Sequence, residues 1–346
     1  MSNALVAALE GNKVVTRTEN GAPTNSTSGL RLLDFFGQGG ALRQRADADI
    51  VKLFKDAFNE DRLLAVKTLF YVRDVRGGQG EKRTFRILLK WLANQYPDIV
   101  RKNLALIAEY GSYNDYRVLF GTPVENDFVE LVKNQVVADL KTDKPSLLAK
   151  WLPSENASST ETKTQARKLM KALDLTPKQY RKVLTELRRR INIVERLMCQ
   201  GNFGDVNYEA VPSRAAMIYR KAFRRQDEAR YTEYLSAVEK GEKVIKATTL
   251  FPYDITRTIL NAGYASADFQ TLNAQWNSLP NYFEGSAFKK WIALVDVSGS
   301  MEQDGKLPMA SSIGLGIYCA ERCTGPFQDK YITFTSTPKF LTVTGK

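Results

Sequence analysis

Short segments with apolar residues three or four positions apart follow one another along much of the chain. The first runs from Asp47 to Asp74 and predicts two helices joined near Asn59. Residues 99–108, 113–120 and 126–141 show the same spacing. A helix pair of this kind can bury its apolar face only against neighbouring pairs. The pattern therefore predicts a mainly α fold, a HEAT-like α-solenoid built from helical hairpins.

Residues 177–200 carry the most regular of these patterns. Their apolar positions, from Tyr180 to Met198, predict one long helix with a single buried stripe. Cations recur at shared heptad positions along the other face, namely Arg181 and Arg188 at one position and Lys182, Arg189 and Arg196 at another. This basic ridge can contact the phosphates of a nucleic acid. It can also be a solvated helix surface, with Glu186 and Glu195 reducing its charge.

A second basic segment runs from Ser213 to about Gly241 and predicts further helix. Its cations are interleaved with aromatic residues such as Phe223 and Tyr231. Basic and aromatic side chains together can hold phosphates and stack bases, but aromatic residues at helical spacing also form helix cores. The candidates for nucleic-acid contact in the two segments are Arg181, Lys182, Arg188, Arg189, Arg196, Arg220, Arg224 and Arg225.

The positive charge of the chain is concentrated in this region. The net charge is +12, with a pI near 9.4. Lys163 to Lys246 contain 20 Lys and Arg residues against 10 Asp and Glu residues. Such a concentration is typical of proteins that bind a phosphate backbone, although solubility alone also tolerates it. Nucleic acid and an acidic protein surface are the expected partners.

The chain contains no histidine and three cysteines. Without histidine, Ser-His-Asp and Cys-His catalytic arrangements are excluded, as is the usual general base at neutral pH. We therefore expect a protein that is not an enzyme. Cys319 and Cys323 lie four residues apart on a predicted helix from Leu307. Two small buried thiols are expected there, and a metal held by the two sulfurs is the alternative.

Length and composition limit the organisation of the chain. A chain of 346 residues, 43% of them hydrophobic, can form two domains, or one large helical domain with a smaller one. No apolar run approaches the ~20 residues that span a bilayer. Residues 1–21 also lack the basic start and apolar block of a secretory signal. We expect a cytoplasmic protein with no membrane partner, whose residues 1–30 form a flexible arm.

Residues from Trp291 to Met301 combine a predicted strand with an oxygen-rich loop. Residues 291–295 are apolar without alternation, which predicts a strand covered on both faces of a parallel sheet. The residues that offer oxygen ligands after the strand are Asp296, Ser298 and Ser300. Gly299 allows a tight bend between them. This set suits Mg²⁺ or Mn²⁺ better than zinc; the alternative is an ordinary turn.

Three glycines in residues 77–80 lie between two predicted helices. The segment is only superficially like a phosphate-binding loop, because the Gly-x-x-x-x-Gly-Lys-Ser/Thr pattern is not satisfied and no buried strand precedes it. We interpret the glycines as the end of one helix and the beginning of the next. Nearby cations such as Arg73 and Arg83 could contact phosphate, but a solvated helix junction is the preferred interpretation.

Four motifs occur in an order that resembles one family. They are Tyr71–Lys82 (YVRDVRGGQGEK), Ala149–Glu155 (AKWLPSE), Val211–Arg214 (VPSR) and Val295–Met301 (VDVSGSM). The family is a domain of unknown function found in plants, microbes and phages, and its layout is similar to that of the Ro/TROVE-domain RNA-binding proteins. The last motif resembles the first loop of a von Willebrand factor A domain, where it forms part of a metal-ion-dependent adhesion site.

The resemblance implies an architecture and a function. A HEAT-like helical domain over residues 31–285 would be followed by a partial α/β von Willebrand A-type domain over residues 286–346, since 45 residues after Met301 hold only part of such a domain. The basic helices would hold RNA phosphates, in a non-enzymatic scaffold. Asp296, Ser298 and Ser300 would be the metal ligands of an incomplete, weak site, which a second chain could complete. The alternative is a structural or assembly protein, for example of a phage particle, that acts through protein–protein contacts. A phage-encoded protein would be located in the host cytoplasm or in the virion.

Overall fold

The computed structural model describes residues 15–17, 21, 23–25, 27–191, 193–263, 268–284 and 291–344. The chain is mainly helical and has a small three-stranded sheet near its C-terminus. It divides into two compact units, Met1–Ile193 and Val194–Lys346. In the described part of the chain, no helix is long and apolar enough to cross a membrane.

Unit 1 is built from helices after a short N-terminal strand pair. Its elements are β1 (Val15–Arg17), β2 (Pro23–Asn25), α2 (Arg31–Gln38), η1 (Gly39–Gln44), α3 (Asp47–Glu60), α4 (Arg62–Arg73), α5 (Lys82–Gln95), α6 (Pro97–Tyr110), η2 (Tyr113–Leu119), α7 (Glu125–Leu140), α8 (Leu148–Trp151), α9 (Thr160–Ala172) and α10 (Pro177–Ile191). Strands β1 and β2 pair antiparallel, with Thr16 opposite Thr24. Part of the expected flexible arm is thus a paired strand, while residues 1–14 lie outside the described residues.

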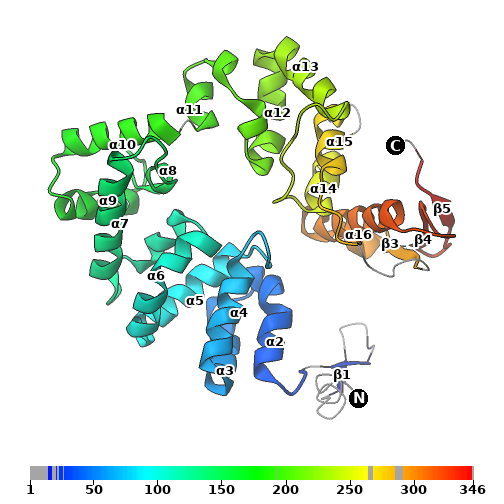
Figure 1. Cartoon of the computed structure of the whole chain (residues 1–346). Helices are drawn as coiled ribbons and strands as arrows, with labels where there is room; N and C mark the ends of the chain where they lie inside the picture. Colours follow the sequence, from blue (N-terminus) through cyan, green and yellow to red (C-terminus); the bar gives the residue numbers. More distant parts are fainter. Residues whose placement is uncertain are drawn as a thin grey trace. The chain divides into compact units, whose positions relative to one another are not determined.

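Helices α3, α4, α5 and α6 lie side by side in unit 1 (Figure 1). The junction between α3 and α4 confirms the predicted break near Asn59, because Asp61 caps the second helix by accepting a 2.8 Å hydrogen bond from the Leu64 backbone N–H. Most apolar positions of the periodic pattern form one core, in which Phe54, Phe58 and Phe85 are fully buried, whereas Leu63 and Leu64 are exposed. Burial of such large side chains is the main stabilising term for these helices.

The glycine segment is a helix junction, as the sequence indicates. The backbone N–H groups of Gln79 and Gly80 donate to the carbonyls of Tyr71 and Asp74 at the end of α4. A Cβ on Gly78 would lie 1.8 Å from the Tyr71 carbonyl oxygen, so only glycine fits there. Because these N–H groups bond within the junction, they are not directed at a phosphate.

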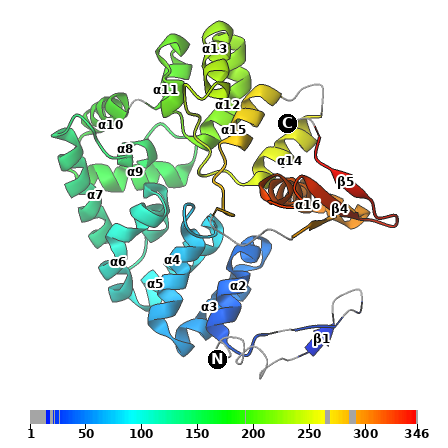
Figure 2. The same cartoon turned by 45° about the vertical axis from the view of Figure 1, so that its right-hand side comes forward.

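The predicted single helix over residues 177–200 is wrong. Helix α10 ends at Ile191, and a separate helix, α11 (Val194–Cys199), begins in unit 2. The apolar residues of this stripe pack into two different cores. Leu184 and Leu187 are buried in the core of unit 1, whereas Val194 and Leu197 are buried in a core of unit 2. Within unit 1, α10 packs on α8, in the part of the unit that also contains α7 and α9 (Figure 2).

Unit 2 consists of helices followed by the sheet. After α11, its elements are η3 (Phe203–Asp205), η4 (Tyr208–Ala210), α12 (Ser213–Gln226), α13 (Glu228–Glu239), α14 (Pro252–Ala262), α15 (Phe269–Asn277), β3 (Ala293–Asp296), η6 (Gly299–Glu302), α16 (Gln303–Arg322), β4 (Lys330–Phe334) and β5 (Phe340–Thr342). The expected domain boundary at residues 285 and 286 falls outside the described residues. Within this unit, α14 packs closely on α16.

The aromatic residues of the second basic segment form a core. Phe223, Tyr231 and Tyr234 are buried together with Tyr208, and the ring centroids of Tyr208 and Tyr231 are 4.8 Å apart. The Tyr231 hydroxyl lies 3.0 Å from Oγ1 of Thr271. The interpretation of these aromatic residues as helix core is therefore confirmed, and their faces are not available for base stacking.

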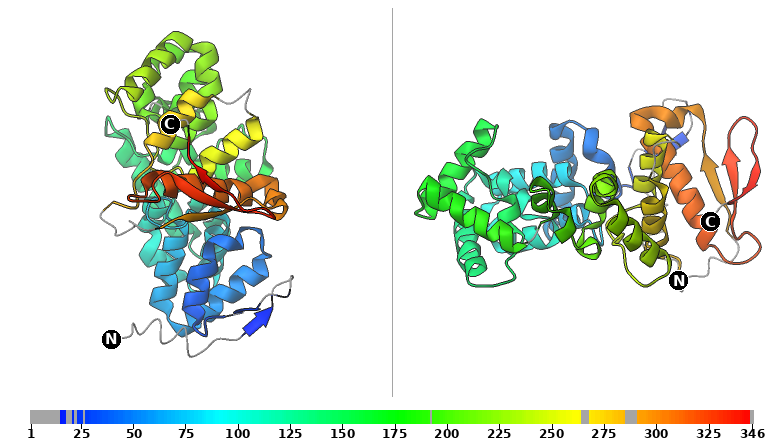
Figure 3. Two further views of the ribbon diagram at one scale, coloured as in Figure 1. Left: turned by 90° about the vertical axis from the view of Figure 1, so that its right-hand side faces the viewer. Right: turned by 90° about the horizontal axis from the view of Figure 1, so that it is seen from above.

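The sheet has the order β3-β4-β5, with β3 parallel to β4 and β4 antiparallel to β5. Helix α16 lies along one face of it (Figure 3), where Val295 is buried and a Cβ on Gly316 would lie 2.3 Å from the Val295 side chain. On the other face, Leu294 is 64% exposed. The expectation that residues 291–295 are covered on both faces is therefore wrong, because a single helical layer of the described residues covers this sheet.

Candidate nucleic-acid interface

One face of α10 carries exposed cations. Lys178, Arg181 and Lys182 line an open hollow of about 580 Å³ together with Thr185 and Glu186. These positions recur three and four residues apart, so they follow one stripe of the helix. Both lysines are exposed, and within the described residues neither has an ion-pair partner. The hollow is therefore a site where positive charge is not neutralised by the protein.

Two other cations of the predicted ridge are paired with carboxylates. Arg181 forms an ion pair with Glu155, and Nη2 of Arg189 lies 2.8 Å from Oε1 of Glu186. Hydrogen bonds from Arg189 and Arg190 lower the pKa of Glu186 to about 2, so this carboxylate stays charged at neutral pH. The pairs are exposed and contribute little to stability. They nevertheless reduce the charge that these two arginines offer to a ligand.

Arg188 does not belong to the exposed ridge. Its Nε and Nη2 donate to the carbonyls of Ala149 and Leu152, and its Nη1 donates to Ser154. Burial lowers the pKa of this guanidinium. The side chain thus joins α10 to the segment after α8, and it is a structural residue rather than a candidate for phosphate contact.

The cations of unit 2 are also divided between internal and exposed positions. Arg220 is 7% exposed and donates to the Met217 carbonyl. Arg224 pairs with Asp268 at 3.2 Å, between Nη2 and Oδ1. Arg196 is half-buried on α11. Arg225 alone among the unit 2 candidates is well exposed, and it has no ion-pair partner within the described residues.

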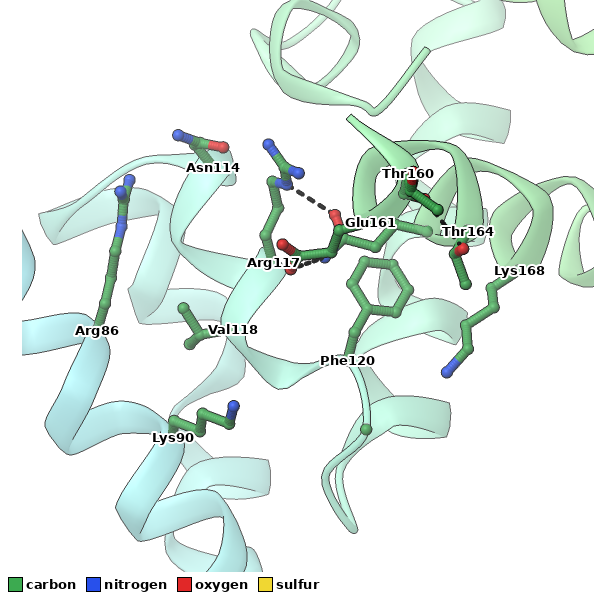
Figure 4. A pocket seen from close by; sticks show the side chains of 12 residues that line it. Arg86, Lys90, Asn114, Arg117, Val118, Phe120, Thr160, Glu161, Thr164 and Lys168 are labelled. Atoms are coloured by element: carbon green, nitrogen blue, oxygen red, sulfur yellow. Dashed lines mark hydrogen bonds between the residues drawn. The ribbon is translucent and has the colours of Figure 1, made fainter. Parts of the chain in front are cut away.

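A basic pocket in unit 1 was not predicted. It is an open pocket of about 670 Å³ between α5, η2 and α9, and four cationic side chains line it: Arg86, Lys90, Arg117 and Lys168. Figure 4 shows Arg86 and Lys90 on one side and the α9 side chains Thr160, Thr164 and Lys168 on the other, with Arg117 between them. The signal in the sequence is the four-residue spacing of Arg86 and Lys90. Nothing in the sequence places Arg117 and α9 beside them.

The oxygen-rich loop after β3 brings its three predicted residues together. Oδ1 of Asp296 accepts a 2.9 Å hydrogen bond from the Ser298 backbone, and the hydroxyl oxygens of Ser298 and Ser300 are 3.1 Å apart. Hydrogen bonds from Ser298 lower the pKa of Asp296. Gly299 is not needed for a tight bend, because it lacks a left-handed φ and a Cβ would meet no atom within 4 Å.

The donor set of this loop fits only part of a metal site. Three hard oxygen atoms suit Mg²⁺ or Mn²⁺, which takes six oxygen ligands and keeps several waters. In the part of the chain that the structure describes, no group of three or more His, Cys, Asp or Glu side chains could hold a metal ion. Asp296 would therefore be the single carboxylate ligand, with Ser298 and Ser300 beside it. Cys323 is buried and Cys319 half-buried, as expected for two small thiols.

These features define the class of protein: a mainly helical chain with a basic helical face and pocket, followed by a short α/β portion. The chain belongs to the family described as a domain of unknown function, DUF2828, whose model matches residues 18–110 and 105–285. A second domain of unknown function, DUF7788, matches residues 290–346. The first match ends at residue 285, and the second begins at residue 290. Neither description names a Ro-type or von Willebrand A domain.

A viral protein is similar to this chain over most of its length. It is the uncharacterized protein L728 of Acanthamoeba polyphaga mimivirus, which is 30% identical over 369 aligned residues. The alignment includes 95% of this chain but 63% of the viral protein, so the chain spans a little under two thirds of that relative. No solved structure matches the chain.

Proposed function

We propose that this protein is a non-enzymatic RNA-binding scaffold whose phosphate contacts are made by the exposed face of α10. The observation that carries the proposal is the hollow lined by Lys178, Arg181 and Lys182, because its two lysines have no carboxylate partner among the described residues. The α9–α10 hairpin, residues 160–191, contains ten Lys and Arg residues against three Asp and Glu residues. A phosphate backbone is the polyanion that such a surface attracts most strongly.

The choice of RNA rests on the resemblance to Ro-type proteins. In that layout a HEAT-like stack is followed by a von Willebrand A-type domain, and we assign the helices up to α15 and the portion from β3 onward to those two parts. Asp296, Ser298 and Ser300 would hold Mg²⁺ or Mn²⁺ weakly, because one carboxylate and two hydroxyls supply a minority of the ligands. The ion would be structural in this proposal, and RNA binding would not depend on it.

A charge reversal on α10 tests the proposal. The double variant Lys178→Glu and Lys182→Glu should bind a structured RNA at least about tenfold more weakly than the unmodified chain at low salt, since two phosphate contacts are lost and two repulsions are added. Fluorescence anisotropy of a labelled RNA measures the change. Arg188 is not a suitable target, since its contacts with Ala149 and Leu152 hold unit 1 together.

The matched control carries the same charge change elsewhere in unit 1. Lys52 and Lys55 are exposed on α3, outside the hollow and the pocket. The variant Lys52→Glu and Lys55→Glu should retain RNA affinity within about twofold, the small change expected from net charge alone. Equal affinities for the two double variants would refute the assignment to α10. Absence of RNA binding by the unmodified chain would refute the function.

The second candidate function is self-assembly through the sheet. Leu294, Ile332 and Phe340 are opposite one another in the strand register, and on this face Leu294 and Phe340 are 64% and 57% exposed. A second copy of the chain could cover this row by face-to-face sheet packing. Light scattering after size exclusion would then show a nuclease-resistant oligomer that Leu294→Glu dissociates. A monomer that is unchanged by nuclease and by Leu294→Glu would exclude this candidate.

A further inference from the structure

The pocket between α5, η2 and α9 contains more positive charge than the protein neutralises. Asp115 is fully buried and accepts from Arg86 Nε at 2.7 Å, but it also pairs with the buried Arg73, so one carboxylate serves two guanidinium groups. In the described residues, Arg86 forms its hydrogen bond through Nε, and its two terminal nitrogens form none. Arg86 therefore retains donors and net charge for a ligand.

Arg117 is held by uncharged groups. Its Nε donates to Oε1 of Gln165 at 2.8 Å, and its Nη2 donates to Oγ1 of Thr162 at 2.9 Å. Gln165 is 4% exposed, so it fixes the guanidinium from inside the fold without neutralising it. Figure 4 shows Arg117 between Arg86 and the α9 side chains. A guanidinium fixed in this way is prepared for a bidentate contact with a phosphate or carboxylate.

The remaining charged side chains leave the balance positive. Lys90 is exposed and, within the described residues, has no acceptor for its ammonium group. Lys168 is neutralised by Glu125, whose two carboxylate oxygens lie 2.7 and 2.8 Å from Nζ. Glu161 is the one carboxylate among the lining residues, and it accepts from Nε2 of Gln165 at 3.1 Å. Arg86, Lys90 and Arg117 thus face a single lining carboxylate.

We propose that this pocket binds the 5′-phosphate of a nucleotide, supplied either by a free nucleotide or by the 5′ end of an RNA. A terminal phosphate monoester carries nearly two negative charges at neutral pH, whereas each internal phosphate of a chain carries one. Three cations that surround one cavity favour the more highly charged group. The hydroxyl of Thr160 and the amide of Asn114 add neutral donors beside them, whereas the Thr164 hydroxyl already donates to the Thr160 carbonyl.

The size and shape of the pocket also favour a chain end. Its volume of about 670 Å³ is in the range of small-molecule sites. The α10 hollow is lined by one helix, along which a backbone can run, whereas residues of three elements line the pocket and can contact a terminal group from several sides. The RNA part of this proposal rests on the proposed function, whereas the free-nucleotide part does not.

Two ligand pairs test the proposal on the full chain. Calorimetry compares adenosine 5′-monophosphate with adenosine, and anisotropy compares one RNA oligonucleotide with a 5′-phosphate or a 5′-hydroxyl. The phosphate form of each pair should bind about tenfold more tightly, as charge-assisted hydrogen bonds predict. The variants Lys90→Gln and Arg117→Gln should each reduce the preference to about threefold or less. Lys55→Gln, an exposed lysine on α3, should retain it.

The outcomes separate this proposal from the proposed function. The double variant Lys178→Gln and Lys182→Gln should bind the 5′-phosphate RNA and the 5′-hydroxyl RNA more weakly by the same factor. Its preference for the 5′-phosphate should therefore be retained. If the chain binds adenosine 5′-monophosphate but neither RNA, the proposed RNA-binding function is refuted. The pocket proposal is then supported with a free nucleotide as its ligand. Equal binding within both ligand pairs would overturn the proposal. So would a preference that persists in Lys90→Gln and in Arg117→Gln, because the phosphate would then lie elsewhere.

Discussion

Nε of Arg117 donates a 2.8 Å hydrogen bond to Oε1 of Gln165, a buried and uncharged side chain. A carboxylate at this position would hold the guanidinium equally well but would cancel its charge. The amide instead fixes the arginine and leaves its charge to the pocket. Arg188 is also held by uncharged acceptors, the carbonyl groups of Ala149 and Leu152, but its guanidinium is largely buried within the fold.

The variant Gln165→Glu tests the function of this uncharged partner. The substitution conserves shape and adds one negative charge beside Arg117, so affinity for adenosine 5′-monophosphate should fall about tenfold or more. Calorimetry measures the change. Gln179→Glu, an exposed substitution in the same unit, should leave the affinity unchanged. If Gln165→Glu binds the monophosphate as tightly as the unmodified chain, Arg117 is not a phosphate ligand.

The buried ion pair of Arg73 and Asp115 should be essential for the stability of unit 1. The exposed fractions of the two side chains are 2% and 0%, and Nη2 of Arg73 lies 2.8 Å from Oδ2 of Asp115. Asp115→Asn leaves the buried guanidinium without a charged partner, which should lower the free energy of unfolding by about 3–5 kcal/mol. Urea unfolding monitored by circular dichroism measures this quantity.

A matched aspartate is available on the surface. Asp98 pairs with Arg101 at 2.8 Å and is 85% exposed. Asp98→Asn should change the free energy of unfolding by less than about 0.5 kcal/mol. Similar losses in the two variants would show that burial of the Arg73 pair does not determine its contribution.

The glycine junction after α4 should tolerate no side chain at Gly78. A Cβ there would lie 1.8 Å from the Tyr71 carbonyl oxygen, which belongs to the backbone and cannot turn away. Gly78→Ala should lower the free energy of unfolding by about 2–3 kcal/mol or more. Gly37 is inside α2 and has open space around its Cβ position, so Gly37→Ala should raise it by about 0.5–1 kcal/mol. Thermal unfolding of the pair should give shifts of opposite sign.

The buried tyrosines of unit 2 should make the fold sensitive to alkaline pH. Burial raises the pKa of Tyr231 to about 12 and also raises the pKa values of Tyr208 and Tyr234. Because the unfolded phenol ionises near pH 10, their contribution to stability is complete below about pH 10 and is lost as the pH rises through about 12. The last rise in tyrosinate absorbance, which comes from the buried tyrosines, should therefore coincide with the loss of helical circular dichroism in this window. Ionisation of all fifteen tyrosines by about pH 10 with the helices intact would contradict the expected burial.

Local patterns gave correct predictions where one segment determines its own structure. The 3.6-residue spacing over residues 47–74 predicted α3 and α4. Asp296, Ser298 and Ser300 lie together in one loop, as their spacing predicts, and their role as metal ligands stays a prediction. In each case, the residues that form the feature are neighbours in sequence.

Predictions that depended on distant contacts were less reliable. The orientation of Arg188 toward the Ala149 carbonyl and the burial of Arg220 depend on other helices, so heptad position did not reveal them. The break after Ile191 occurs because one apolar stripe contributes to two cores. The basic pocket combines residues 86–90, 117 and 160–168, and no local pattern joins such separated segments.

The salt dependence of RNA affinity tests the central claim most directly. Binding through α10 phosphate contacts predicts that the logarithm of the association constant falls linearly with the logarithm of salt concentration. In the double variant Lys178→Gln and Lys182→Gln, the slope of this plot should become shallower by about 0.7 for each lysine replaced. This value applies to single-stranded RNA at the α10 surface. Lys52→Gln with Lys55→Gln should keep the original slope. Absence of RNA binding, or an unchanged slope in the α10 variant, would contradict the account.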